Sequence, residues 1–96
     1  MNTRTDCVAI TGLIDIESVV GYRNRMMAEI EGKTRVAFDL ETLELDGSAV
    51  IALLVDVFRV AKKTGVDIEY QRCSPQLMKI AAVNGVDDIL PMHPLS

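Results

Sequence analysis

The 96-residue sequence contains no tryptophan and only two tyrosines and two phenylalanines. Because almost half of its residues are nevertheless hydrophobic, the core must consist mainly of aliphatic side chains and methionine. Long apolar runs are also absent, since the longest, Ala49–Val55, is far shorter than the roughly 20 residues of a membrane-spanning helix. No apolar signal region follows the first six residues. We therefore expect one cytoplasmic domain over residues 1–96, with no direct membrane insertion.

Residues that bind metals or act in catalysis are scarce. The sequence has two cysteines, Cys7 and Cys73, with no Cys-x-x-Cys pair, and its one histidine, His93, lies in the last four residues. We expect both cysteines to be buried free thiols and His93 to be exposed to solvent. No catalytic residue, cofactor site or metal site is predicted.

The charge and the motifs narrow the function classes further. The net charge is −4 and the basic residues are scattered, so nucleic acid is not an expected partner. No glycine-rich phosphate loop is present, which argues against an ATPase or a kinase. The acidic residues Asp39, Glu41, Glu44 and Asp46 leave open a small phosphate- or metal-dependent enzyme. That alternative ranks behind non-enzymatic interpretations, because charge runs in turns are usually solvated.

Strand-like and helix-like patterns alternate along the chain. Strands are predicted for Cys7–Thr11, Val36–Leu40 and Val66–Tyr70. The first helix follows an N-cap at Asp15, ends at Gly32 and is expected to use Ile16 and Val20 on its apolar face. The second helix runs from about Ser48 to Thr64, and the third begins at Ser74-Pro75 and ends at Asn84-Gly85. This order predicts a small α/β domain with a mixed, mostly parallel sheet and helices mainly on one face.

The second predicted helix carries more apolar residues than one buried face requires. At about 100° per residue, Leu53, Leu54 and Val57 face the sheet, whereas Asp56 and Arg59 face water. A row of small and apolar residues then lies on the water side. We interpret it as a docking patch for a partner protein, and the same face could pair with a second copy of the chain. The predicted contact residues are Asp46, Gly47, Ser48, Ile51, Ala52, Val55, Asp56 and Arg59.

The Asp46-Gly47-Ser48 corner opens that helix. Serine at this position commonly caps a helix by accepting hydrogen bonds from free backbone N–H groups. The alternative is a phosphoacceptor hydroxyl, whose phosphate would be favoured by the helix dipole, opposed by the charge of Asp46, and would add about two negative charges to a contact surface.

Several motifs in this order resemble the STAS domain family, which includes bacterial anti-sigma factor antagonists and cytoplasmic domains of sulfate transporters. Each motif is weak alone, but together they span nearly the whole chain. The matching segments are Ile10–Asp15, Val36–Leu40, Asp46–Leu54, Ser74–Leu77 and Asn84–Pro91. The resemblance implies a non-enzymatic protein-interaction module of the anti-sigma factor antagonist-like fold.

Two branches of the family imply two partners. The STAS subunit of Mla-type phospholipid ABC transporters is short, often has alanine where Ala49 stands, and has a similar third helix. This resemblance implies docking on the transporter's ATPase and is our first interpretation. In phosphoregulated anti-sigma factor antagonists, the second residue after the aspartate is the phosphorylated serine, which is Ser48 here. That alternative implies an anti-sigma factor or a serine kinase as partner, although Gly47 replaces the usual first hydroxyl residue.

Overall fold

The computed structural model describes residues 6–95, which form six strands and three helices. The elements, in chain order, are β1 (Asp6–Ala9), β2 (Gly12–Ile14), α1 (Val19–Ile30), β3 (Arg35–Asp39), β4 (Leu43–Leu45), α2 (Ala49–Thr64), β5 (Asp67–Cys73), α3 (Pro75–Val83) and β6 (Met92–Pro94).

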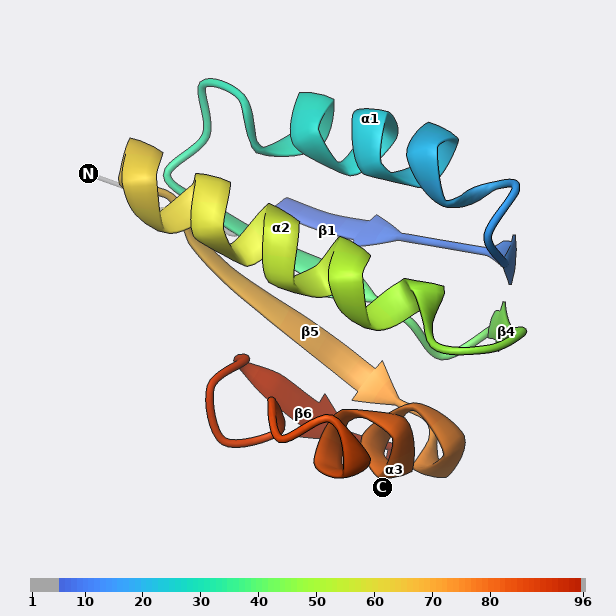
Figure 1. Ribbon diagram of the computed structural model, residues 1–96. Coiled ribbons are helices and arrows are strands. Elements are labelled where there is room, and N and C mark those ends of the chain that lie inside the picture. The colour runs from blue at the N-terminus through green and yellow to red at the C-terminus, as the bar shows by residue number, and fades with distance from the viewer. Residues whose placement is uncertain (1–5, 96) are drawn as a thin grey trace.

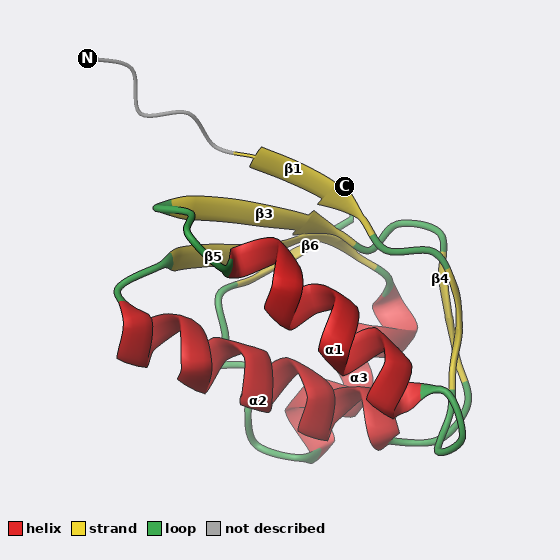
Figure 2. Ribbon diagram, turned by 90° about the horizontal axis from the view of Figure 1, so that it is seen from above, coloured by secondary structure: helices red, strands yellow, loops and turns green. Residues whose placement is uncertain are grey.

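The main sheet has the strand order β1-β3-β5-β6, and every neighbouring pair in it is parallel. The three helices cover one face of this sheet, as the ribbon views show (Figures 1 and 2). The expected α/β fold, with a mostly parallel sheet and helices on one face, is therefore confirmed. Because strands and helices run in opposite directions, the carboxyl ends of the strands and the amino ends of the helices gather at one end of the molecule.

The core lies between the sheet and the helices and is mostly aliphatic, as the composition predicts. Phe38 on β3 and Tyr70 on β5 supply its aromatic contact, with ring centroids 6.1 Å apart. The buried Tyr70 hydroxyl donates a hydrogen bond of 2.8 Å to the carbonyl of Leu54 on α2. This bond satisfies the one polar atom that such a deeply buried tyrosine brings into the core.

The predicted helix boundaries agree with the structure where local signals are strong. Gly65 ends α2 in the left-handed region, at a φ of 80°, which glycine adopts without steric cost. Pro75 occupies the first turn of α3, and the Ser74 hydroxyl accepts a hydrogen bond from the Leu77 N–H. Regular helix in α1 begins later than predicted, at Val19.

The structure contains strands that the sequence analysis missed. β2 pairs with β4 in a separate two-stranded parallel sheet, and β6 adds the fourth strand of the main sheet. Each has only three residues, which is too short for a period-2 pattern to stand out. β4 lies within the segment that the sequence analysis treated as an acidic turn, and β6 carries His93, which is exposed as predicted.

Two expectations about burial are wrong. Ile16 and Val20 are exposed rather than part of the apolar face of α1, with exposed fractions of 83% and 62%. Ile16 lies in the turn before the helix, so the helical spacing does not apply to it. Cys7 is exposed because it alternates along β1 with Val8, which packs against the core, so the two side chains lie on opposite faces of the sheet. Cys73 is buried as expected, and burial raises the pKa of its thiol to about 11.

Candidate functional site

The Asp46-Gly47-Ser48 corner connects β4 to the amino end of α2. The Asp46 N–H donates a hydrogen bond of 3.0 Å to the carbonyl of Ile14, which ties the corner to the end of β2. Gly47 has a φ of 77°, and a Cβ there would meet no other atom within 4 Å. Glycine is therefore favoured at this position by backbone conformation rather than by crowding.

Ser48 is the residue before the first turn of α2, and its side chain is exposed. Its backbone angles, φ −108° and ψ 10°, lie outside the extended region from which a capping side chain reaches the helix. Consistent with this geometry, the Ser48 hydroxyl makes no capping hydrogen bond. The usual structural explanation for serine at a helix start thus does not apply, and the hydroxyl is available to another molecule.

Two surface hollows meet at Ser48. One, of about 480 Å³, lies between the amino ends of α1 and α2 and is acidic on both sides. The other, of about 540 Å³, lies between α2 and α3 and contains Lys79. The lining residues of the first are Asp15, Ile16, Glu17, Asp46, Gly47, Ser48 and Ala49, and those of the second are Gly47, Ser48, Gln76, Lys79, Ile80, Val83 and Asn84.

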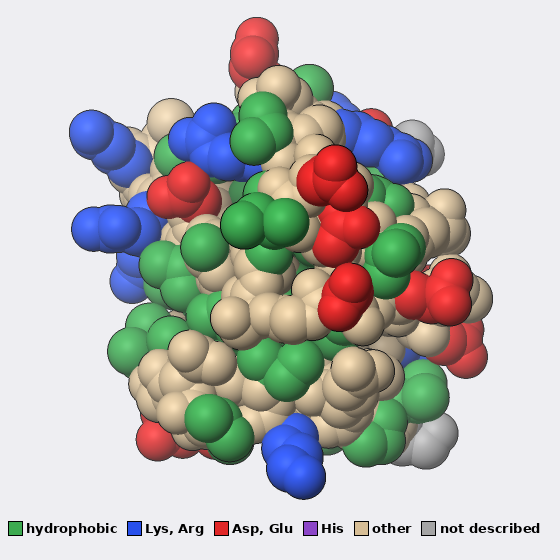
Figure 3. Space-filling view, turned by 45° about the vertical axis from the view of Figure 1, so that its right-hand side comes forward, with side chains coloured by type: hydrophobic (Ala, Val, Ile, Leu, Met, Phe, Trp, Pro, Cys, Tyr) green, Lys and Arg blue, Asp and Glu red, His purple; other side chains and the backbone are tan. Residues whose placement is uncertain are grey.

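Exposed apolar side chains border both hollows. Ile16 borders the acidic hollow, and Val83, which is 79% exposed, borders the one that contains Lys79. Figure 3, which brings the end of the molecule with β4 forward, shows hydrophobic and acidic side chains mixed on this surface. Neither residue is predicted from the sequence, because the helical spacing places Ile16 on a buried helix face and no motif singles out Val83. A surface that combines exposed apolar groups with charged groups is typical of a protein contact site.

The turn that presents Ile16 is held by reciprocal hydrogen bonds. The Asp15 carboxylate accepts from the N–H groups of Glu17 and Ser18 at 3.0 and 2.9 Å. The Ser18 hydroxyl in turn accepts from the Asp15 N–H and donates to the carbonyl of Leu13. The hydrogen bond from the Ser18 N–H lowers the pKa of Asp15. Asp15 thus holds the turn before the helix, whereas the N-cap of α1 itself is Ser18 and not Asp15 as predicted.

The predicted docking patch on α2 is only partly exposed. Ala52 is exposed, Val55 is half-buried against the core, and Ile51 is only 7% exposed. The inclusion of Ile51 in the contact surface is therefore wrong. The helical projection treated the sheet as the sole neighbour of α2, whereas this helix lies between α1 and α3 (Figure 1). A residue at the margin of the buried face is then covered as well.

The two charged residues of the predicted docking patch, Asp56 and Arg59, differ in their surroundings. Asp56 accepts a hydrogen bond of 2.9 Å from Arg23 on α1, so it belongs to an ion pair between helices. Arg59 is exposed. The structure thus leaves Asp46, Gly47, Ser48, Ala52 and Arg59 open at the surface, and it half-buries Val55 and Asp56.

The acidic residues considered for a metal site are partly neutralised. Arg72 on β5 pairs with both Asp39 and Glu41, and its hydrogen bond to Asp39 lowers the pKa of that carboxyl group. Within residues 6–95, no three His, Cys, Asp or Glu side chains are arranged to hold a metal ion. None of the helices in that range is long and apolar enough to cross a membrane.

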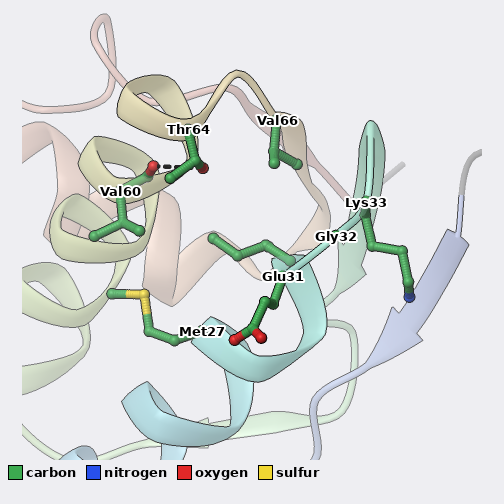
Figure 4. A pocket seen from close by; sticks show the side chains of 8 residues that line it. Met27, Glu31, Gly32, Lys33, Val60, Thr64 and Val66 are labelled. Atoms are coloured by element: carbon green, nitrogen blue, oxygen red, sulfur yellow. Dashed lines mark hydrogen bonds between the residues drawn. The ribbon is translucent and has the colours of Figure 1, made fainter.

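A further hollow, of about 330 Å³, lies where the carboxyl ends of α1 and α2 meet (Figure 4). Two of its polar side chains, those of Lys33 and Thr64, already have intramolecular partners. The Lys33 ammonium points away and pairs with Asp6 at 2.8 Å, and the Thr64 hydroxyl donates to the carbonyl of Val60 at 2.9 Å. The Ser48 end of the molecule is therefore the stronger candidate for function.

Comparison with known proteins shows the family and the fold of the chain. The family model of the STAS domain matches residues 1–95. Among solved structures, the anti-sigma factor antagonist SpoIIAA in its unphosphorylated form is similar, with a TM-score of 0.74 and 18% sequence identity. The match covers 99% of this chain and 83% of that one. No curated protein sequence matches the chain.

Proposed function

Since this chain belongs to the STAS domain family, whose members are protein-interaction modules, we propose that it is the accessory subunit that docks on the ATPase of a phospholipid-transport ABC system. The single observation that carries the proposal is the exposed Ser48 corner, whose hydroxyl does not cap its own helix. The contact is made by the corner, by Ala52 and Arg59 on α2, and by the apolar side chains of Ile16 and Val83 beside it. No cofactor takes part.

Burial of the apolar side chains contributes to the affinity of this contact. Fully burying a large aliphatic side chain contributes about 1.5–3 kcal/mol, so Ile16 and Val83 supply part of the affinity, and the other residues of the contact supply the rest. The charged groups in the two hollows orient the partner, because they present acidic groups on one side of Ser48 and Lys79 on the other.

The test is a capture assay with the purified ATPase subunit of a phospholipid ABC transporter from the same source. Replacing the exposed Ala52 by arginine places a long charged side chain in the contact and should weaken capture by about tenfold or more. Ala28→Arg is the matched control, because Ala28 is exposed on α1 and lies outside the proposed contact. Equal capture by Ala52→Arg, Ala28→Arg and the unchanged protein would contradict the proposal.

A second candidate is an anti-sigma factor antagonist switched by phosphorylation of Ser48. The specific observation in its favour is again the free, exposed hydroxyl, together with the likeness to SpoIIAA. A phosphate at Ser48 adds about two negative charges beside Asp46 and close to the acidic hollow. It would therefore repel an acidic partner surface and change docking without refolding the chain.

A phosphorylation assay distinguishes the two candidate functions. Under the second, a serine kinase of the anti-sigma type labels the protein, and Ser48→Ala abolishes the label. Retention of the label in Ser48→Ala would exclude Ser48 as the acceptor, and failure to label the unchanged protein would leave the transporter proposal as the stronger one.

A further inference from the structure

The groove between α2 and α3 leaves apolar side chains of α3 uncovered. Leu77 and Ala81 are the buried residues of this helix and supply its contact with the core. Val83 stands two residues after Ala81, which places it on the opposite side of the helix, and it is 79% exposed. Ile80, which is half-buried, lines the same groove. An aliphatic side chain that the core does not use, beside a groove, is favoured where another surface covers it.

The start of α2 forms the other wall of the groove, and its residues are small. Gly47 and Ser48 line the groove, and the exposed Ala52 follows one helical turn after Ser48. Side chains of this size allow the backbone of another molecule to approach α2 closely. The groove has a volume of about 540 Å³, which is within the range of pockets that hold small ligands and is sufficient for more than one partner side chain.

Lys79 determines the sign of the charge in the groove. It is the only charged residue among the described residues that line it. Its side chain is exposed, and its ammonium group forms no ion pair with a carboxylate in the described part of the chain. The other side of Ser48 carries the carboxylates of Asp15, Glu17 and Asp46. A carboxylate of a partner is therefore attracted to the Lys79 side of Ser48 and repelled from the opposite side.

We propose that this groove binds a segment of the partner in which an aliphatic side chain stands beside an aspartate or a glutamate. The aliphatic side chain packs against Ile80 and Val83, and the carboxylate pairs with Lys79. The inference rests on the proposed function, in which the partner is the ATPase, and adds the chemistry of the surface that the ATPase presents. Charge complementarity selects an acidic segment over a basic one, because a basic segment would bring like charges together at Lys79.

Charge reversal at Lys79 tests the sign of the partner's charge. Lys79→Glu should weaken capture of the purified ATPase subunit by about tenfold or more, because it places two carboxylates against each other. Arg25→Glu is the matched control, since it makes the same change of net charge at an exposed residue of α1 that lines neither hollow beside Ser48. It should leave capture unchanged. Both variants should unfold at the temperature of the unchanged protein, because both residues are exposed.

A zero-length cross-link identifies the acidic residue of the ATPase. A carbodiimide joins the Lys79 amine, as an amide, to a carboxylate that lies in direct contact with it, and mass spectrometry of the cross-linked complex then gives both residues. We expect the ATPase peptide to contain an aspartate or a glutamate next to an aliphatic residue. Replacing that acidic residue by lysine should restore capture of the Lys79→Glu variant.

The outcomes separate this inference from the proposed function. Normal capture by Lys79→Glu together with weakened capture by Ala52→Arg would overturn the inference and leave the proposed function intact. A defect that Lys79→Glu shares with Arg25→Glu would also overturn it, because net charge alone would then explain the loss. Failure of the unchanged protein to capture the ATPase would contradict the proposed function, and this inference with it.

Discussion

Two serines that precede helices show how backbone angles decide what a side chain does. Ser74 has an extended backbone, with ψ at 158°, and its hydroxyl accepts the Leu77 N–H at 3.2 Å. Ser48 has ψ at 10° and makes no such bond. A hydroxyl that is not required by its own helix is free for a partner or a kinase, and this difference favours Ser48 over Ser74 as a candidate contact residue.

We therefore predict that the same substitution has effects of different size at these two serines. Ser74→Ala should lower the free energy of unfolding by about 1 kcal/mol, because it removes a helix cap. Ser48→Ala should change it by less than about 0.5 kcal/mol, because no cap is lost. Urea denaturation of both variants measures the difference. A loss at Ser48 as large as that at Ser74 would show that the Ser48 hydroxyl does cap α2.

Among the elements, α1 and α2 pack side by side on the sheet and are also joined by a charge pair. Arg23, which interrupts the apolar pattern of the first helix, pairs with Asp56 on α2 at 2.9 Å. Both side chains are almost half exposed, so water screens their attraction. The packing of these helices thus depends on their buried apolar side chains, and the charge pair contributes little.

A double-mutant cycle tests whether the charge pair between α1 and α2 contributes little to stability. Replacing Arg23 and Asp56 by alanine, singly and together, should give a coupling energy below about 1 kcal/mol. Tyr70→Phe provides a buried comparison, because it removes the hydrogen bond to the Leu54 carbonyl, and should lower the free energy of unfolding by about 1 kcal/mol. A coupling energy of about 3 kcal/mol would mean that the ion pair is far more important than its exposure suggests.

For the molecule as a whole, carboxylates that are held by hydrogen bonds link stability to pH. The pKa of Asp39 is lowered by its hydrogen bond to Arg72, and that of Asp15 by the Ser18 N–H. A lowered native pKa means that the stabilisation is fully present above the unfolded value of 3.8 and is lost as the pH falls through the lower native value. The protein should therefore lose stability below a pH of about 4.

Thermal unfolding at a series of pH values tests this expectation. The melting temperature should be nearly constant from neutral pH down to about 5 and should then fall as these carboxylates bind protons. Asp39→Asn should begin from a lower melting temperature at neutral pH and should fall less on acidification. If this variant has the same acid transition as the unchanged protein, the Asp39–Arg72 pair does not contribute to it.

Features that depend on local chemistry can be predicted from the sequence alone. Alternating apolar residues predict β3 and β5, a glycine and a proline mark the end of α2 and the start of α3, and the composition predicts an aliphatic core. The Asp46-Gly47-Ser48 corner was also located correctly, because strand-to-helix turns have recognisable residues. These signals lie within a few neighbouring residues, so no knowledge of the rest of the chain is needed to read them.

Which surfaces remain exposed depends on how the elements pack together in three dimensions. This packing covers Ile51, exposes Ile16, joins Arg23 to Asp56 and pairs the three-residue strands β2 and β4. Each outcome depends on contacts between segments that are distant in the sequence. The helical period of a single element carries no information about such contacts. The physical reason is that burial and charge pairing are properties of neighbours in space, whereas a sequence pattern records only neighbours along the chain.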